Sequence, residues 1–281
     1  MTRKIQQLSE SGLRVSYLEE GEGQPLVLIH GVGMNADAWY PQIEVLSRHF
    51  RVLAVDMPGH GESSGFQHPV SLKDYVHWLA QFLQTQPEQN FAVAGHSMGA
   101  LITAGIAIEH PELVNHAVVM SGVFKRNDSA RDAVLKRAQE LASGSVRLDA
   151  PLERWFSAQP HELPLRQQVG GWLKQVNLAG YARAYQAFAD GDRWYSDRWN
   201  EMQCPVLVMT GELDANSNPN MTHQMAEAAP HGQAVVVANA KHMLNLTDAD
   251  RVNEEILSFL NTDVGAAMKN KASKGVSYGC R

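Results

Sequence analysis

The sequence predicts an α/β fold in which helices flank a mostly parallel sheet. Residues 25–29 and 205–209 have the near-continuous apolar content of central strands that are buried on both faces. After residue 23, apolar runs of this kind alternate with helical segments up to residue 120, as in sheets whose strands are joined by helices. With 281 residues and 44% apolar content, the chain can bury a large core within one domain.

The two ends of the chain and its middle depart from this alternation. Residues 1–20 predict an antiparallel start, because residues 15–18 alternate between apolar and polar and residues 21–23 form a turn. The middle lacks a strong strand and instead predicts amphipathic helices at 130–141 and 167–176. We therefore divide the chain into a first part of the core, a helical insertion, a second part of the core and a mobile tail rich in Lys, Gly, Ala and Ser, at residues 1–122, 123–200, 201–261 and 262–281.

A serine lies at a predicted strand-to-helix bend. A strand at 90–94 precedes Gly95-His96-Ser97-Met98-Gly99, and an apolar helix at 100–108 follows it. Gly95 and Gly99 lack a Cβ, so strand and helix can approach closely while Ser97 takes a strained conformation that exposes its Oγ. This is the pattern of a nucleophile elbow. The alternative interpretation of Ser97 is an ordinary N-cap of the following helix.

Two backbone N–H groups near Ser97 are candidates for an oxyanion hole. The predicted strand at 25–29 ends in the loop His30-Gly31-Val32-Gly33, from which Val32 can supply one donor. Met98 is the first residue of a helix, so its N–H has no partner within that helix. Fixed donors of this kind stabilise the negative oxygen that develops during acyl transfer.

An acid and a histidine follow two later strands. The strand at 205–209 leads to Asp214, and the strand at 234–237 leads to His242. The order Ser97, Asp214, His242 places each residue just past the carboxyl end of a predicted strand, and it differs from the orders of chymotrypsin and subtilisin. We expect His242 to exchange the proton of Ser97 while Asp214 holds the imidazole in the required tautomer.

From about residue 13 to about residue 261, the chain resembles α/β-hydrolase-fold proteins. The turn at 55–63 is similar to the D-x-P-G-x-G-x-S turn of this superfamily, with Asp56 tying the loop. Residues 180–214 are also similar to the 3-oxoadipate enol-lactonases and related carboxylic-ester hydrolases. The resemblance implies an eight-stranded sheet with a helical cap inserted after the sixth strand, over Ser97.

Three residues compete with the predicted acid and histidine. Asp128 follows the predicted strand at 117–121, whose end carries the acid in some members of the superfamily, and it is the main alternative to Asp214. Glu212 lies two positions before Asp214. His231 lies in a turn before a strand, at the wrong end of the sheet for a partner of Ser97.

The cap carries aromatic and basic side chains that could reach a substrate. Its aromatic residues are suited to forming the wall of a pocket, although most of them could equally pack the cap onto the core: Trp155, Phe156, Trp172, Trp194, Tyr195 and Trp199. Nine arginines lie from Arg126 to Arg198, and each could face either a substrate carboxylate or solvent.

These features predict a serine hydrolase that cleaves a small carboxylic ester or lactone through an acyl-enzyme. A serine at position 97 disfavours the dehalogenase and epoxide hydrolase reactions of the superfamily, which need a carboxylate there. The sequence around Ser97 does not separate this reaction from hydrolysis of thioesters or amides or from cofactor-free perhydrolysis, and two alternatives of another kind stay open at this point. One is a carbon–carbon bond hydrolase acting on ring-fission dienoates, and the other is a binding protein of the same fold without activity.

Composition limits the other functions that we expect. The net charge of -6 and the absence of an apolar N-terminal or membrane-spanning stretch argue against nucleic-acid and membrane binding. Two cysteines form neither a disulfide framework nor a metal cluster, so we expect a cytoplasmic protein. We expect no cofactor and no metal, with a small molecule as the substrate, and we leave homo-oligomer formation open.

Overall fold

The structure is a computed structural model that describes residues 1–144 and 149–261. The described residues form one eight-stranded sheet with the order β1-β2-β4-β3-β5-β6-β7-β8. Its strands are β1 (Thr2–Gln7), β2 (Arg14–Glu20), β3 (Pro25–Ile29), β4 (Arg51–Val55), β5 (Phe91–His96), β6 (Val114–Met120), β7 (Val206–Gly211) and β8 (Gly232–Val237). Strand β2 is antiparallel to β1 and β4, and the other neighbouring strands are parallel. The predicted fold class is therefore confirmed.

Helices cover both faces of the sheet. On one face lie α2 (Leu72–Gln84), α3 (Met98–Glu109) and α8 (Pro219–Ala228), which pack against side chains such as Val27 and Val93. On the other face lie α1 (Tyr40–Leu46), the short α9 (Leu244–Thr247) and α10 (Ala249–Leu260), which pack against side chains such as Leu28 and Ala94. Since neighbouring residues of a strand point to opposite faces, each central strand is buried on both sides, which explains its continuous apolar sequence.

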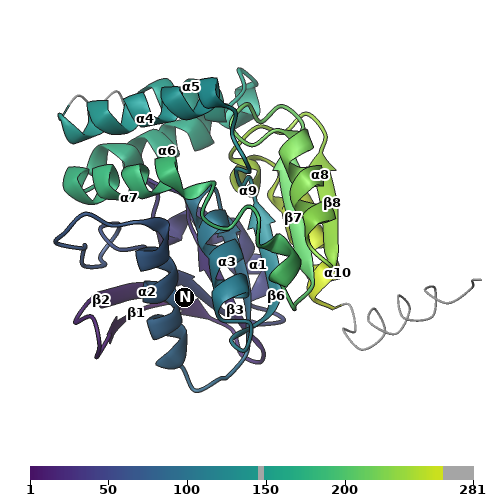
Figure 1. Ribbon diagram of the computed structural model, residues 1–281. Coiled ribbons are helices and arrows are strands. Elements are labelled where there is room, and N and C mark those ends of the chain that lie inside the picture. The colour runs from purple at the N-terminus through teal and green to yellow at the C-terminus, as the bar shows by residue number, and fades with distance from the viewer. Residues whose placement is uncertain (145–148, 262–281) are drawn as a thin grey trace, which may run out of the picture.

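A helical insertion follows β6, as expected. It contains α4 (Asp128–Ala142), α5 (Asp149–Trp155), α6 (Leu163–Gln175) and α7 (Leu178–Gly191), and Figure 1 shows these four helices gathered at the top of the view, above α2 and α3. We call this insertion the cap. Helix α4 begins earlier than predicted because the Asn127 side chain accepts a hydrogen bond from Ala130 N, which caps the first turn.

The cap meets the core at a close backbone contact, and a buried ion pair closes the cap on itself. Gly59 has a φ of +78°, and a Cβ there would lie 2.7 Å from Gly180 Cα, so the turn and α7 meet without side chains between them. The Asp192 carboxylate accepts hydrogen bonds from Arg126 N at 2.8 Å and from Arg131 Nη2 at 2.9 Å. These bonds join the start of the insertion to its end.

The remaining expectations about organisation are not all covered by the described residues. The predicted tail at 262–281 lies outside them, and the boundaries proposed between core and cap stay predictions. Within residues 1–144 and 149–261, we find no helix whose length and apolar content would let it cross a bilayer.

Candidate active site

Ser97 lies at a sharp bend between β5 and α3. Its φ of 56° is uncommon for a residue with a side chain and marks a strained backbone. A Cβ at Gly95 would lie 2.0 Å from the carbonyl oxygen of Gly99, and a Cβ at Gly99 would lie 2.1 Å from that of Ile29. The two glycines are therefore required for strand and helix to meet, as the sequence predicts.

His242 and Asp214 form a buried pair. His242 Nδ1 lies 2.8 Å from Asp214 Oδ2, and both side chains are almost completely buried. The other carboxylate oxygen, Oδ1, accepts hydrogen bonds from the backbone N–H groups of Asn216 and Ser217 at 2.8 and 3.1 Å. Burial opposes the charge of Asp214, but the attraction of His242 and these hydrogen bonds outweigh it and lower the pKa of the carboxyl group.

The backbone of His242 is held by the core of the protein. His96 Nε2 lies 2.8 Å from the His242 carbonyl oxygen and therefore donates to it, and Ser121 Oγ donates to the same oxygen at 3.3 Å. Burial, and then repulsion by His242, lowers the pKa of His96 to about 3, so its imidazole is neutral. The histidine next to the candidate nucleophile thus positions the loop that carries His242.

The loop after β3 is a tight turn that two other neutral histidines hold. Met34 N donates to Gly31 O at 3.1 Å, and Gly33 N donates to His60 Nε2 at 3.0 Å. His30 Nε2 accepts a hydrogen bond from Met57 N at 3.0 Å. Burial lowers the pKa of His30 to about 4 and that of His60 to about 3, which keeps both ring nitrogens in these acceptor roles. The candidate donor Val32 lies in the middle of this turn.

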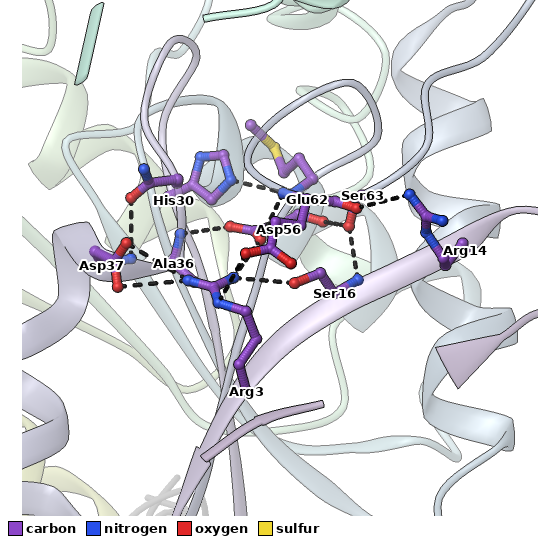
Figure 2. A network of polar contacts seen from close by, with 11 residues as sticks. Arg3, Arg14, Ser16, His30, Ala36, Asp37, Asp56, Glu62 and Ser63 are labelled. Carbon is purple, nitrogen blue, oxygen red and sulfur yellow. Dashed lines mark hydrogen bonds and ion pairs between the residues drawn. The ribbon is translucent and has the colours of Figure 1, made fainter. Parts of the chain in front are cut away.

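Asp56 ties its own turn at residues 55–63, as the sequence predicts, and also binds the loop after β3. Its Oδ1 accepts a hydrogen bond from Ala36 N at 2.8 Å, and its Oδ2 accepts from Glu62 N at 3.1 Å and from Arg3 Nη1 at 2.8 Å. Figure 2 shows these contacts converging on Asp56, with His30 beside them and Arg3 reaching in from β1. The first strand therefore supports the loop that carries Val32.

A cavity of about 640 Å³ lies between the core and the cap. Ser97, His242 and Val32 line it from the core, where β5, β8 and β3 end. Because the carboxyl ends of parallel strands meet at one edge of the sheet, residues far apart in the chain converge at this cavity. Met98, the second predicted oxyanion donor, is buried beside Ser97 at the first position of α3.

The cap wall of the cavity is aromatic and basic. Trp155 lines it, together with Tyr181 and Tyr185 of α7, which the sequence had not singled out. The other five aromatic residues that the sequence offered for this wall pack elsewhere or are exposed. Phe156 and Trp172 pack in a small apolar cluster that joins the cap to core residues such as Met243. Tyr195 and Trp199 pack onto the main core, and Trp194 is 42% exposed.

Two arginines of this wall face the cavity without an acidic partner in the described ranges 1–144 and 149–261. Arg137 Nε donates to the Tyr185 hydroxyl at 3.1 Å, whereas Arg154 Nε is buried and has no hydrogen-bond partner. Burial, followed by repulsion from Arg137, lowers the pKa of Arg154, so the two guanidinium groups are close enough to affect each other. Glu140 also lines the cavity, but it is exposed and forms no ion pair with either arginine.

The competing residues are placed away from His242. The Asp128 side chain is 95% exposed at the start of α4 and lies 3.6 Å from Arg193. Glu212 Oε2 accepts a hydrogen bond from Asn239 N at 2.9 Å, where it holds the turn after β8. His231 precedes β8, and its backbone carbonyl accepts a hydrogen bond from Val206 N at 3.1 Å, at the opposite end of the strand from His242.

A comparison with protein families assigns the chain. The model of the alpha/beta hydrolase family matches residues 26–255. The chain belongs to the alpha/beta hydrolase family. It is a hydrolase of this family, and its relatives include esterases.

Two relatives show the range of hydrolases that the chain resembles. It is 46% identical over 262 residues to (E)-2-((N-methylformamido)methylene)succinate hydrolase of Acinetobacter baylyi, and the match covers 93% of this chain and 99% of the relative. It is 30% identical over 254 residues to pimeloyl-[acyl-carrier protein] methyl ester esterase of Aliivibrio salmonicida, covering 87% of this chain and 95% of the relative.

Solved structures of the alpha/beta hydrolase fold superpose well on the chain. A thermophilic esterase from Thermogutta terrifontis matches with a TM-score of 0.84 at 21% identity, covering 92% of this chain and 98% of the esterase. An enol-lactonase from Burkholderia xenovorans matches with a TM-score of 0.82 at 24% identity, covering 92% of this chain and 99% of the lactonase. At these identities, the similarity shows the shared fold.

Proposed function

We propose that this hydrolase uses Ser97, His242 and Asp214 to cleave the bond that joins the carbonyl carbon of a short acyl group to a small dicarboxylate. The bond can be an ester, the first choice from the sequence, or an amide, which the sequence left open. The observation that carries the proposal is the cavity itself. It has Ser97 and His242 on one side and the guanidinium groups of Arg137 and Arg154, free of acidic partners among the described residues, on the other.

The proposed reaction follows the geometry of the site. Ser97 Oγ attacks the carbonyl carbon while His242 Nε2 takes its proton, and Asp214 keeps Nδ1–H in place and stabilises the imidazolium. The N–H groups of Val32 and Met98 hold the oxyanion of the tetrahedral intermediate. The intermediate collapses as His242 returns the proton to the leaving oxygen or nitrogen, and a water molecule then hydrolyses the acyl-enzyme by the same steps.

The cap arginines support the choice of a dicarboxylate. Arginine is suited to carboxylates because its planar guanidinium can donate two parallel hydrogen bonds. A buried donor without a partner, such as Arg154 Nε, is costly, and a substrate carboxylate in the cavity would satisfy it. The relative from Acinetobacter baylyi is named for a succinate that carries an (N-methylformamido)methylene group. The succinate has two carboxylates, and the formamido group has one short acyl carbonyl.

The assay compares this succinate with its dimethyl ester and with p-nitrophenyl acetate. We expect turnover of the dicarboxylate, and roughly a 100-fold lower kcat/KM for the uncharged dimethyl ester at the formamide carbonyl. Ser97→Ala should lower kcat by about 1,000-fold or more on every substrate. Retention of more than a tenth of the activity by Ser97→Ala would reject the proposed nucleophile.

The same assay separates the alternatives that the sequence left open. A serine hydrolase should give burst acylation with p-nitrophenyl acetate and labelling of Ser97 by an organophosphate. A ring-fission dienoate in the panel tests carbon–carbon bond cleavage. Efficient dienoate cleavage with weak turnover of the succinate would favour that reaction, and no acylation with any reagent would favour a binding protein.

A further inference from the structure

An aromatic ring of the cap lies over the imidazole of His242. Trp155 ends α5, and the centroid of its ring lies 5.8 Å from that of His242, with 27° between the ring planes. The next cap residue makes a second contact with the same loop, because the Phe156 carbonyl accepts a hydrogen bond from Lys241 Nζ at 3.0 Å. Two consecutive residues of the cap thus contact two consecutive residues of the loop after β8.

The contacts of His242 with the core fix its Nδ1 atom and its backbone, whereas Trp155 is the residue that faces its ring. Asp214 fixes Nδ1, and His96 and Ser121 hold the backbone carbonyl. The His96 ring is closer, at 4.9 Å between centroids, but it is tilted by 54° and is itself a neutral imidazole. Trp155 is the nearly parallel neighbour, and the face of an indole is electron-rich and attracts cations.

We infer that Trp155 is a positioning residue for His242, holding its ring in plane and stabilising the imidazolium that forms when Ser97 is deprotonated. The inference rests on the proposed function, in which His242 is the base. An imidazolium carries positive charge only during the reaction, so an indole face over it stabilises the transition state more than the resting enzyme. The cap would then contribute to the rate as well as to the shape of the cavity.

Several charged or titratable groups also act on His242 and define the controls. Asp214 lies against it from the loop after β7, His96 from β5, and Lys241 precedes it in its own loop. The wall of the shared cavity adds Arg126, Arg137, Arg154 and Glu140, of which Arg126 is paired with Asp192. Substitution of Trp155 leaves all of these charges in place. The Lys241 contact also persists, because Phe156 contributes a backbone carbonyl.

The test compares Trp155→Leu with Trp155→Phe. Leucine keeps apolar bulk without a ring, whereas phenylalanine keeps a weaker aromatic face. We expect Trp155→Leu to lower the plateau value of kcat about tenfold and to move the acid limb of kcat/KM roughly 0.5 to 1 pH unit lower. Trp155→Phe should recover most of both changes.

Trp172→Leu is the matched control. Trp172 packs against the same apolar cluster as Trp155, which lies between the cap and the core, but it does not line the cavity. We expect this variant to leave kcat and the pH profile unchanged. A general loosening of the cap would instead alter kcat and the pH profile of Trp172→Leu and Trp155→Leu to the same extent. That result would overturn the inference. A rise in KM with unchanged kcat and an unchanged acid limb would also overturn it, because Trp155 would then only line the pocket.

A measurement without turnover separates this inference from the proposed reaction. The imidazole signals of the intact protein are titrated by NMR, and the His242 signal is assigned by its loss in His242→Gln. We expect the titration midpoint of His242 to be lower in Trp155→Leu than in the unsubstituted protein, with Trp155→Phe between them. Coincident midpoints in all three proteins would reject the stabilising role, whichever substrate the enzyme uses.

Discussion

The core side of the cavity holds its groups with neutral, buried imidazoles, whereas the cap side presents charged and only partly buried arginines. His30, His60 and His96 each accept or donate a hydrogen bond that fixes a loop next to Ser97, and burial lowers the pKa of each to about 4 or 3. On the cap side, Arg137 and Arg154 are half-buried and lack acidic partners among the residues that the structure describes.

The difference suits the two sides to different proposed roles: the core side holds the catalytic groups, and the cap side binds an anionic ligand. Neutral groups can be buried completely when their hydrogen bonds are satisfied, so they hold the proposed catalytic groups rigidly. Charged groups without partners keep a strong preference for an oppositely charged ligand. We therefore expect substitutions on the core side to affect every substrate, and substitutions on the cap side to affect anionic substrates most.

The largest expected effect concerns the acid on the core side. Asp214→Asn should lower kcat by about 10,000-fold, because an amide cannot keep His242 in the tautomer that accepts the proton of Ser97. Asp128→Asn is the control, since Asp128 is exposed at the start of α4. Steady-state kinetics on the two variants decides whether Asp214 or Asp128 is the acid that pairs with His242. A larger loss in Asp128→Asn would transfer the role of the acid to Asp128.

The oxyanion loop should give the next largest effect. Val32→Pro removes the backbone N–H that we assign to the oxyanion hole and should cost about 3 kcal/mol of transition-state stabilisation. Val32→Ala keeps that N–H and should lose far less activity. Both variants are compared by kcat/KM on the dicarboxylate and on p-nitrophenyl acetate, after circular dichroism has shown that they fold. Equal losses would place the donor elsewhere.

The cap side should discriminate between substrates. Arg154→Gln and Arg137→Gln should each lower kcat/KM for the dicarboxylate by roughly 10- to 100-fold, since a charge-assisted hydrogen bond contributes about 1.5 to 3 kcal/mol. The change on p-nitrophenyl acetate should be much smaller. Arg166→Gln, on α6 and away from the cavity wall, is the matched control. Parallel losses on both substrates would contradict the division between core and cap.

The smallest expected effect concerns the stability of the core side at acidic pH. The folded-state pKa of His60 is below its ordinary value of 6.5, so the unfolded chain binds more protons than the folded one between about pH 6.5 and 3. Stability is therefore lost as the pH falls through this window, by about 2 kcal/mol for this histidine at pH 5.

Urea unfolding at pH 8 and pH 5 measures this loss. His60→Gln keeps an acceptor for Gly33 N–H but takes up no proton, so the difference between the two pH values should shrink by about 2 kcal/mol. His68→Gln, at an exposed position, should leave the difference unchanged. If both variants behaved alike, His60 would not be held neutral by burial.

Local sequence was sufficient for the parts of the molecule that depend on neighbouring residues. The apolar runs of β3 and β7 predict buried parallel strands, and the glycines on both sides of Ser97 predict its bend, because backbone sterics act over a few residues. The order of Ser97, Asp214 and His242 predicts their convergence, since parallel strands end at one edge.

The groups that face the cavity from the cap could not be ranked from the sequence. The sequence offered nine arginines and six aromatic residues as candidates, and among those that the structure describes, Arg126, Arg137, Arg154 and Trp155 line the wall. Their orientation depends on how α4, α5 and α7 pack over the sheet. Helix packing sets which residues face inward through contacts between segments far apart in the chain, and periodicity alone does not encode it.

The partners of the buried histidines were also decided by tertiary structure alone. His60 and His96 stand in motifs that the sequence identifies, but their hydrogen bonds reach Gly33 and His242, which are 27 and 146 residues away. Motif spacing predicts which elements exist and in what order. The distances and burial that fix the protonation of these imidazoles arise only when the strands assemble into one sheet, because desolvation depends on everything that surrounds a group.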